Sequence, residues 1–184
     1  DSYDNLGDHV AIIGAGNVAM DAARTILRKT NAKVDVIFNR GEELVTALRE
    51  ELQLALVDGI KMNYYLNTVK IESDGIIVEP VLKEVNEDET VTYINNTDNA
   101  YKFECSSVII AIGQGAESNI VSNSKKNIDT TNRGLIQTTQ KGATTRPGVF
   151  AAGDVVSGAR TVVEAVAATK LVAEEIEEYI KNNY

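Results

Sequence analysis

The stretch that decides the fold is VAIIGAGNVAMDAAR, residues 10–24. It passes from a short apolar run, through a turn with two glycines, into a pattern typical of an amphipathic helix. The spacing Gly14-x-Gly16-x-x-Ala19 departs from the G-x-G-x-x-G dinucleotide fingerprint only at its last position, where alanine is also small. Gly14 permits the tight turn, Gly16 lets a pyrophosphate approach the backbone, and Ala19 lets helix and strand pack closely. The stretch therefore predicts a phosphate-binding strand–turn–helix, with an ordinary strand–turn–helix as the alternative.

The residues after this unit indicate which dinucleotide the chain binds. Residues 9–13, 16–29 and 33–38 predict a strand, a helix and a second strand. NAD and the ADP half of FAD usually meet an acidic residue at the end of the second strand. Here Asn39 and Arg40 occupy that place, and Asp35 comes too early. Arg40 suits a 2′-phosphate, so the sequence favours NADP(H) over NAD(H); a solvated loop arginine is the alternative.

The next segments extend this domain. Residues 42–57 predict a helix and residues 60–65 a third strand. The apolar stripe of the helix comprises Leu44, Leu48, Leu52, Ala55 and Leu56. Short strand-like pieces separated by polar turns predict an antiparallel meander at 66–104, and a buried strand follows at 107–112.

The pattern changes after the last of these strands. We expect a domain boundary near 113–120, with an NAD(P)H-binding domain at 1–113 and a second part at 114–184. Residues 118–132 lack regularity, and short strands at 135–137 and 149–152 precede a long helix from about 160 to 181. Its expected inward face comprises Val162, Val163, Val166, Ala167, Leu171, Ile176 and Tyr179. These pieces do not enclose a core, so we expect the second part to need strands from elsewhere.

Composition excludes several classes of function. The net charge of -9 argues against nucleic-acid or anionic-membrane partners, and no apolar run approaches the ~20 residues of a membrane span. The polar start is no signal peptide, which favours a cytoplasmic location. One cysteine, Cys105, and one histidine, His9, exclude a disulfide scaffold, a CxxC pair and a cysteine-rich metal site within these residues. We assign no catalytic side chain and no metal ligand, so a bound cofactor must carry any chemistry.

Three motifs together resemble those of a known superfamily. They are GAGNVAMD at 14–21, AIGQ at 111–114 and PGVFAAGDVV at 147–156. The chain resembles the two-dinucleotide-binding flavoproteins of the pyridine nucleotide-disulfide oxidoreductase superfamily, and within it the small (β) subunit of NADPH-dependent glutamate synthase. The flavin–NADPH portions of dihydropyrimidine dehydrogenase and related ferredoxin:NADP oxidoreductases are similar too.

The resemblance implies an α/β fold with a Rossmann-like NADPH domain inserted into an FAD domain. Residues 114–184 would be the C-terminal, incomplete portion of that FAD domain. No second GxGxxG unit occurs in the sequence. We therefore expect the strand–turn–helix that holds the ADP half of FAD, and an iron–sulfur region, to lie outside these residues. The chain by itself is expected to be an inactive fragment.

The resemblance also assigns roles to residues. The NADPH pyrophosphate would lie against Gly14, Ala15, Gly16, Asn17, Val18 and Ala19. Arg40 would hold the 2′-phosphate, with Asn39 standing where the family often has a first arginine. The nicotinamide would lie near Ala111, Ile112 and Gly113. FAD would meet Gly153 and Asp154, with the Asp154 carboxylate on the ribityl chain and the amides of Thr161 and Val162 directed at the flavin pyrimidine edge.

The activity implied is hydride transfer from NADPH to FAD, with electrons passing onward to an iron–sulfur domain or a larger partner subunit. One alternative is an NAD(P)-binding module of a dehydrogenase or regulatory protein without flavin. That alternative leaves the motif at 147–156 unexplained. A second alternative is a non-enzymatic interaction domain that uses the acidic meander.

Overall fold

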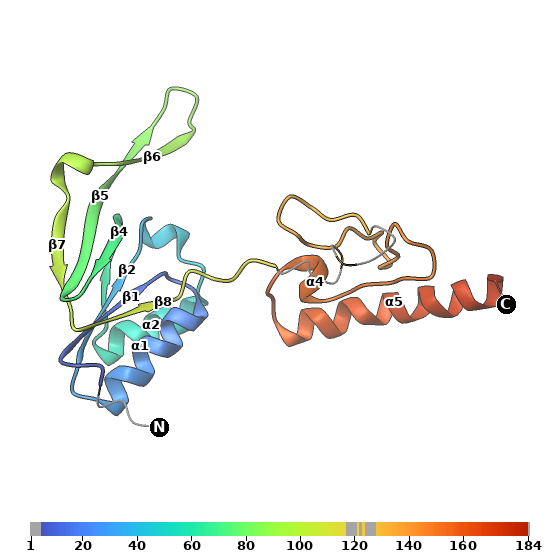
Figure 1. The fold of residues 1–184 in the computed structure, drawn as a ribbon, viewed down its shortest axis with the longest axis horizontal. Helices are drawn as coiled ribbons and strands as arrows, with labels where there is room; N and C mark the ends of the chain where they lie inside the picture. Colours follow the sequence, from blue (N-terminus) through green and yellow to red (C-terminus); the bar gives the residue numbers. More distant parts are fainter. Residues whose placement is uncertain (1–4, 117–120, 122, 124–127, 184) are drawn as a thin grey trace. The chain divides into compact units, whose positions relative to one another are not determined.

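The computed structural model describes residues 5–116, 121, 123 and 128–183. The chain divides into two compact units, Asp1–Gly113 and Gln114–Tyr184, which are described separately (Figure 1). The expected boundary region at 113–120 and the irregular stretch at 118–132 lie partly outside the described residues. No helix in the described part of the chain is both long enough and apolar enough to cross a membrane.

A four-stranded parallel sheet forms the centre of the first unit. Its strands are β1 (His9–Ile13), β2 (Lys33–Ile37), β3 (Lys61–Asn63) and β8 (Ser107–Ile110), in the order β3-β2-β1-β8. Successive side chains of a strand point to opposite faces of a sheet, so both faces of β1 must be covered. Val10, Ala11 and Ile12 are all completely buried, and they lie in the strand that was predicted at 9–13.

Two helices cover one face of this sheet (Figure 1). They are α1 (Asn17–Lys29) and α2 (Arg49–Asp58). The core beneath them includes Met20 and Ala23 of α1 with Val36 of β2. The expected α/β class is therefore confirmed, with the glycine turn placed between β1 and α1.

The predicted helix at 42–57 is wrong in its first half. Glu42–Leu44 form a short 3₁₀ helix (η1), and α2 begins only at Arg49. Leu44 and Leu48 are consequently 44% and 60% exposed, although the sequence pattern had them facing the core. The reason is long-range hydrogen bonding: the amides of residues 46 and 47 donate to the Ala15 carbonyl, at 3.2 and 3.0 Å, instead of continuing a helix.

An antiparallel sheet covers the other face. It contains β4 (Leu66–Glu72), β5 (Gly75–Val85), β6 (Val91–Asn95) and β7 (Tyr101–Glu104). The order differs from a simple meander because β7 pairs with β5 rather than with β6. β5 therefore pairs with three strands. Its residues 75–80 pair with β4, its residues 75–78 also pair with β7 on the other side, and its residues 81–85 pair with β6. A second apolar cluster joins this sheet to the parallel one: Ala11, Ile37, Ile76, Val78 and Cys105.

The second unit contains α4 (Asp154–Ser157), α5 (Val162–Asn183) and long connecting loops. The strands expected at 135–137 and 149–152 are present only as isolated bridges, Thr130 with Ile136 and Ala143 with Phe150. Each segment finds a single bridging partner, so no ladder extends from either.

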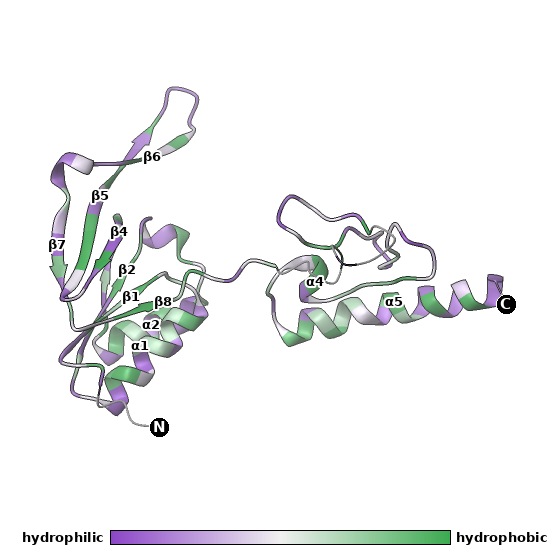
Figure 2. Cartoon of the chain, viewed as in Figure 1, coloured by the Kyte–Doolittle hydropathy of each residue, from purple (hydrophilic) through white to green (hydrophobic). Residues whose placement is uncertain are grey.

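The expected interior face of α5 is also wrong, because no residue of this helix is buried. Val162 and Val163 are 78% and 77% exposed, and hydrophobic residues recur along the helix (Figure 2). One contact between the loops and α5 is made by the Phe150 ring, which lies 5.6 Å from the Tyr179 ring. Within the described residues of the second unit, no core therefore receives the apolar face of α5.

Candidate dinucleotide site

Three predicted segments of the site meet at one edge of the parallel sheet. The glycine turn follows β1, Asn39 and Arg40 follow β2, and residues 111–113 follow β8. The register brings the strand ends together, because Ile13 lies opposite both Ile37 of β2 and Ile110 of β8. The carboxyl edge of an open parallel sheet is where such folds bind ligands.

Gly14 closes the turn at the centre of this edge. Its amide donates to the Ile37 carbonyl at 3.0 Å, and its φ of +115° is a conformation that favours glycine. A Cβ atom at this position would lie 2.3 Å from the Ala111 carbonyl oxygen. Gly14 is therefore required by the protein itself, because no side chain fits between the ends of β1 and β8.

Gly16 differs from Gly14 in this respect. Its φ is −93°, and the nearest atom to an added Cβ would be Thr46 Oγ1, at an ordinary contact distance of 3.5 Å. The described chain has no packing reason for glycine here. A reason does exist if a pyrophosphate lies against this backbone, which is the fit expected for a dinucleotide.

The start of α1 is open to an anion. Gly16 is its N-cap and supplies no side-chain hydrogen bond, and the first turn contains no acidic residue. The first amides of a helix lack intrahelical partners and lie at its positive dipole end. Ala15 and Ala19 are buried, whereas Val18 is 71% exposed beside these amides. The Asn17 side chain is engaged, because its Oδ1 accepts a 2.8 Å hydrogen bond from the Leu48 amide.

Arg40 extends the site along the same edge. Its Nη1 donates to the Asn39 carbonyl at 2.8 Å, and its guanidinium carbon lies 4.2 Å from the centroid of the Tyr93 ring. Arg40 forms no ion pair with a carboxylate among the described residues, although several other cations of this unit do. Its positive charge is thus available to a ligand.

The third segment, after β8, is more open. The Ala111 amide donates to the Ile13 carbonyl at 2.8 Å, which ties this segment to β1. Ile112 is 71% exposed, and an added Cβ at Gly113 would meet no atom within 4 Å. An exposed apolar side chain beside open backbone suits a flat aromatic ring such as nicotinamide.

The expected FAD residues gather separately within the second unit. Gly153, Asp154, Thr161 and Val162 line one hollow of about 390 Å³, together with residues 152, 160, 165, 166 and 169. Gly153 has a φ of +75°, which turns the chain into α4. The four residues that the sequence analysis assigned to FAD therefore lie close together in the fold.

The start of α5 is capped by its own residues. The Thr161 amide and hydroxyl donate to Glu164 Oε2 at 3.0 and 2.7 Å, and the Glu164 amide donates back to Thr161 Oγ1. This is a capping box. Hydrogen bonds from Thr161, and then from Arg160, hold the pKa of Glu164 at about 2. The Thr161 amide is therefore engaged, and a flavin would meet it only if Glu164 moved.

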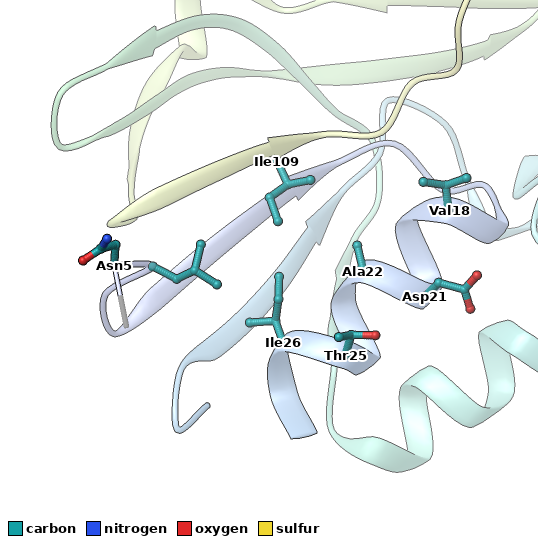
Figure 3. A pocket seen from close by; sticks show the side chains of 8 residues that line it. Asn5, Val18, Asp21, Ala22, Thr25, Ile26 and Ile109 are labelled. Carbon is teal, nitrogen blue, oxygen red and sulfur yellow. The ribbon is translucent and has the colours of Figure 1, made fainter. Parts of the chain in front are cut away.

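A different hollow of about 480 Å³ lies beside α1 (Figure 3). It is lined mostly by apolar side chains of α1 and β8, among them Val18, Ala22, Ile26 and Ile109, with Asn5, Asp21 and Thr25 at its sides. None of the described residues that line it is cationic. Its chemistry suits apolar packing rather than a phosphate-bearing ligand.

Sequence analysis missed the neighbours of Arg40. Glu43, Tyr65, Lys83 and Tyr93 come from η1, the β3–β4 turn, β5 and β6, and no sequence spacing connects them. Lys83 is ion-paired with Glu43, and the Tyr65 hydroxyl donates to the same Glu43 oxygen at 3.3 Å. The hydrogen bond between Lys83 and Glu43 lowers the pKa of the Glu43 carboxyl and raises that of the Lys83 ammonium.

The arrangement defines a class of protein: an α/β dinucleotide-binding fold with a second unit that carries a separate hollow. The family model for pyridine nucleotide-disulphide oxidoreductases matches residues 2–169. The chain belongs to this family.

Two relatives of known name are similar to this chain. The chain is 34% identical, over 95% of its length, to the NADP(+)-dependent formate dehydrogenase subunit beta of Moorella thermoacetica. It is 25% identical, over 95% of its length, to the glutamate synthase [NADPH] small chain of Escherichia coli. It spans 25% and 39% of those two proteins, respectively. The resemblance to glutamate synthase is therefore weaker than that to the formate dehydrogenase subunit, and it does not establish a glutamate synthase activity.

Solved structures confirm the fold. The structure of Mycobacterium tuberculosis FprA in complex with NADPH matches 97% of this chain with a TM-score of 0.77 and 14% identity. The match covers 54% of the FprA chain. At this identity the likeness concerns the fold alone.

Proposed function

We propose that this chain is the NADPH-binding part of a flavin-dependent oxidoreductase. NADPH would lie across the carboxyl edge of the parallel sheet, with its pyrophosphate against Gly14, Gly16 and the first amides of α1. Arg40 would hold the 2′-phosphate and Asn39 would hydrogen-bond beside it. The nicotinamide would reach Ala111, Ile112 and Gly113.

The observation that carries the proposal is the start of α1. Its amides have no side-chain cap, its first turn has no acid, and its N-cap is a glycine whose missing side chain the protein's own packing does not require. These features together suit a bound phosphate. The lack of an ion-pair partner for Arg40 among the described residues supports NADP(H) in particular, because a 2′-phosphate can neutralise that charge.

Residues 114–184 would be the C-terminal portion of an FAD domain, and 1–113 the inserted nucleotide domain. The hollow at Gly153, Asp154 and Val162 fits one part of a flavin, since it offers a carboxylate and apolar walls. The exposed apolar face of α5 supports completion of this domain by further chain. Bound FAD would supply the hydride acceptor. The residues named here would orient the two cofactors, and none of them would act as an acid or base.

Onward electron transfer would involve a larger redox subunit or an iron–sulfur domain, and the chain would be inactive alone. The formate dehydrogenase subunit beta and glutamate synthase small chain, by their names, are parts of larger enzymes. Their similarity to this chain supports an assembly of that kind. A cytoplasmic location accords with NADPH as reductant.

Titration calorimetry with NADPH and NADH tests the nucleotide assignment. We expect NADPH to bind at least about tenfold more tightly, as one charge-assisted phosphate contact provides. Competition by 2′,5′-ADP but not by 5′-AMP would locate the preference at the 2′-phosphate. Equal affinity for the two nucleotides would contradict the NADP(H) assignment, and binding of neither would contradict the proposal as a whole.

The flavin assignment is tested on the longer protein in which these residues occur. We expect it to be purified with a yellow chromophore that NADPH bleaches under anaerobic conditions. A colourless protein that still binds NADPH would instead favour a nucleotide-binding module without flavin.

A further inference from the structure

Residues of four different elements surround Arg40 and Gly41. Tyr65 precedes β4, and its amide donates to the Arg40 carbonyl at 3.2 Å. Tyr93 of β6 lies under the Arg40 guanidinium. Lys83 of β5 and Glu43 of η1 complete the group through their ion pair. The antiparallel sheet thus contributes to the edge of the site that follows β2.

The packing at Gly41 shows how close this group lies to Arg40. A Cβ atom on Gly41 would lie 2.1 Å from Glu43 Oε2 and 2.2 Å from the Tyr65 hydroxyl. The Glu43 carboxylate therefore lies directly against the backbone of the residue that follows Arg40. Because Lys83 binds that carboxylate, its ammonium group is also held beside this part of the loop.

Lys83 and Tyr93 are themselves neighbours. They lie directly opposite each other in the β5–β6 register. The β5–β6 hairpin therefore places the Tyr93 ring beneath the Arg40 guanidinium and the positive charge of Lys83 next to that ring. A cation held over an aromatic face is attracted to the ring and loses freedom of orientation, so Tyr93 can preset the direction of Arg40.

The charge of a bound 2′-phosphate requires a second cation beside Arg40. A 2′-phosphate carries between one and two negative charges near neutral pH, which Arg40 alone does not neutralise. The pair of Lys83 and Glu43 is solvent-accessible, with side chains 35% and 49% exposed. Exposed ion pairs contribute little to stability, so Lys83 can exchange the carboxylate for a phosphate at little cost.

We propose that the β5–β6 hairpin completes the 2′-phosphate site, with Lys83 as the second cation on the phosphate and Tyr93 as the residue that positions Arg40. Glu43 holds Lys83 in place until nucleotide binds. This inference rests on the proposed NADPH site and adds the residues that set its specificity. It assigns the discrimination between NADPH and NADH to two separate parts of the fold, the end of β2 and the antiparallel sheet.

The test measures dissociation constants of NADPH and NADH for wild type, Lys83→Gln and Lys102→Gln. Lys102 is the matched control, because it is a 37% exposed lysine of the same sheet, ion-paired with Asp74 and Glu72. We expect K83Q to raise the dissociation constant of NADPH by about tenfold or more and to change that of NADH less than twofold. K102Q should change neither, and Lys83→Arg should retain most of the preference for NADPH.

Two further variants separate the roles. Glu43→Gln should strengthen NADPH a few-fold, because it removes a negative charge and releases Lys83. Tyr93→Leu should weaken NADPH selectively in the wild type but have no effect when combined with Arg40→Ala, because a positioning residue acts only through its partner.

The outcomes distinguish this inference from the function on which it rests. If wild type prefers NADPH and K83Q leaves that preference intact, the hairpin plays no part and the inference is overturned while the NADPH site stands. The inference is also overturned if K83Q loses affinity for both nucleotides equally, or if E43Q loses affinity for NADH alone. If wild type shows no preference for NADPH, both the assignment of the site and this inference fail.

Discussion

The Nε2 atom of His9 lies 2.7 Å from Oδ2 of Asp35, a side chain with no solvent exposure in the middle of β2. Asn63 Nδ2 donates to the other Asp35 oxygen at 2.8 Å, and Lys33 Nζ lies 3.0 Å from Oδ2. Three donors from three parallel strands thus meet one buried carboxylate, which joins β1, β2 and β3. The histidine of this chain is thereby given a structural role.

Replacing Asp35 by Asn should destabilise the first unit by about 2–4 kcal/mol, because buried donors lose a charged acceptor. Native-state hydrogen exchange of the β1 and β2 amides measures this unit specifically. Asp98→Asn, an exposed carboxylate of η2 (Thr97–Asn99), is the control and should change stability by less than about 0.5 kcal/mol. An equally small effect at Asp35 would show that the group is dispensable.

The same carboxylate predicts a pH dependence. Burial alone would raise the pKa of Asp35, but hydrogen bonds from Asn63, Lys33 and His9 outweigh it, so the pKa lies below its usual value of 3.8. A group with a lowered folded-state pKa stabilises fully above its unfolded value and loses that contribution as the pH falls below it. The difference in stability between wild type and D35N should therefore shrink as the pH falls below about 4. A difference that grew on acidification would contradict this assignment.

Gly14 and Gly16 should respond oppositely to the same substitution. Gly14→Ala places a Cβ 2.3 Å from the Ala111 carbonyl at a φ of +115°, and we expect it to destabilise the first unit by about 2 kcal/mol or more. Gly16→Ala meets only Thr46 Oγ1 at 3.5 Å and should fold normally but bind NADPH at least about tenfold more weakly. Thermal unfolding and calorimetry on the pair measure both effects. Unchanged NADPH affinity in a folded G16A variant would place the pyrophosphate elsewhere.

These two glycines also show why part of the fold was predictable. The spacing of Gly14, Gly16 and Ala19 is a local signal, and the strands and helix around it follow from residues close in sequence. The broken start of α2 was not predictable in this way. There the hydrogen bonds of residues 46–48 go to Ala15 and Asn17, about thirty positions earlier, and they override a good helical pattern.

The residues of the candidate site also differ in whether the local sequence could predict them. Arg40 was predicted to hold a 2′-phosphate because of its position at the end of the second strand. Lys83 and Tyr93 come near it only through the pairing of β5 with β6. Strand order is set by tertiary packing, so β7 pairing with β5 could not be read from alternation alone. The apolar residues of α5 were predicted to face an interior, but none of them is buried among the described residues of the second unit.

Cys105 should behave as a buried, unreactive thiol. It is 7% exposed in the cluster between the two sheets, and burial raises the pKa of its thiol above the usual value of 9.0. Since thiolates are the reactive form, alkylation of the native protein near pH 7.5 should be at least about a hundredfold slower than that of the urea-unfolded protein. Mass spectrometry of iodoacetamide adducts measures the two rates. Rapid labelling of the native protein would show that the two sheets separate readily around this side chain.

Arg40→Ala should weaken NADPH binding by about 1–3 kcal/mol and leave NADH nearly unchanged, because it removes a charge-assisted contact to the 2′-phosphate only. The guanidinium forms no ion pair with a described carboxylate, so its loss leaves no buried charge behind and should not destabilise the fold. Calorimetry with both nucleotides at two salt concentrations gives the measurement, and the NADPH preference of the wild type should decrease at the higher salt. Arg28→Ala is the control, because Arg28 pairs with Asp58 on the outer face of α1 and α2. Equal weakening of both nucleotides in R40A would mean that Arg40 supports the loop after β2 rather than the phosphate.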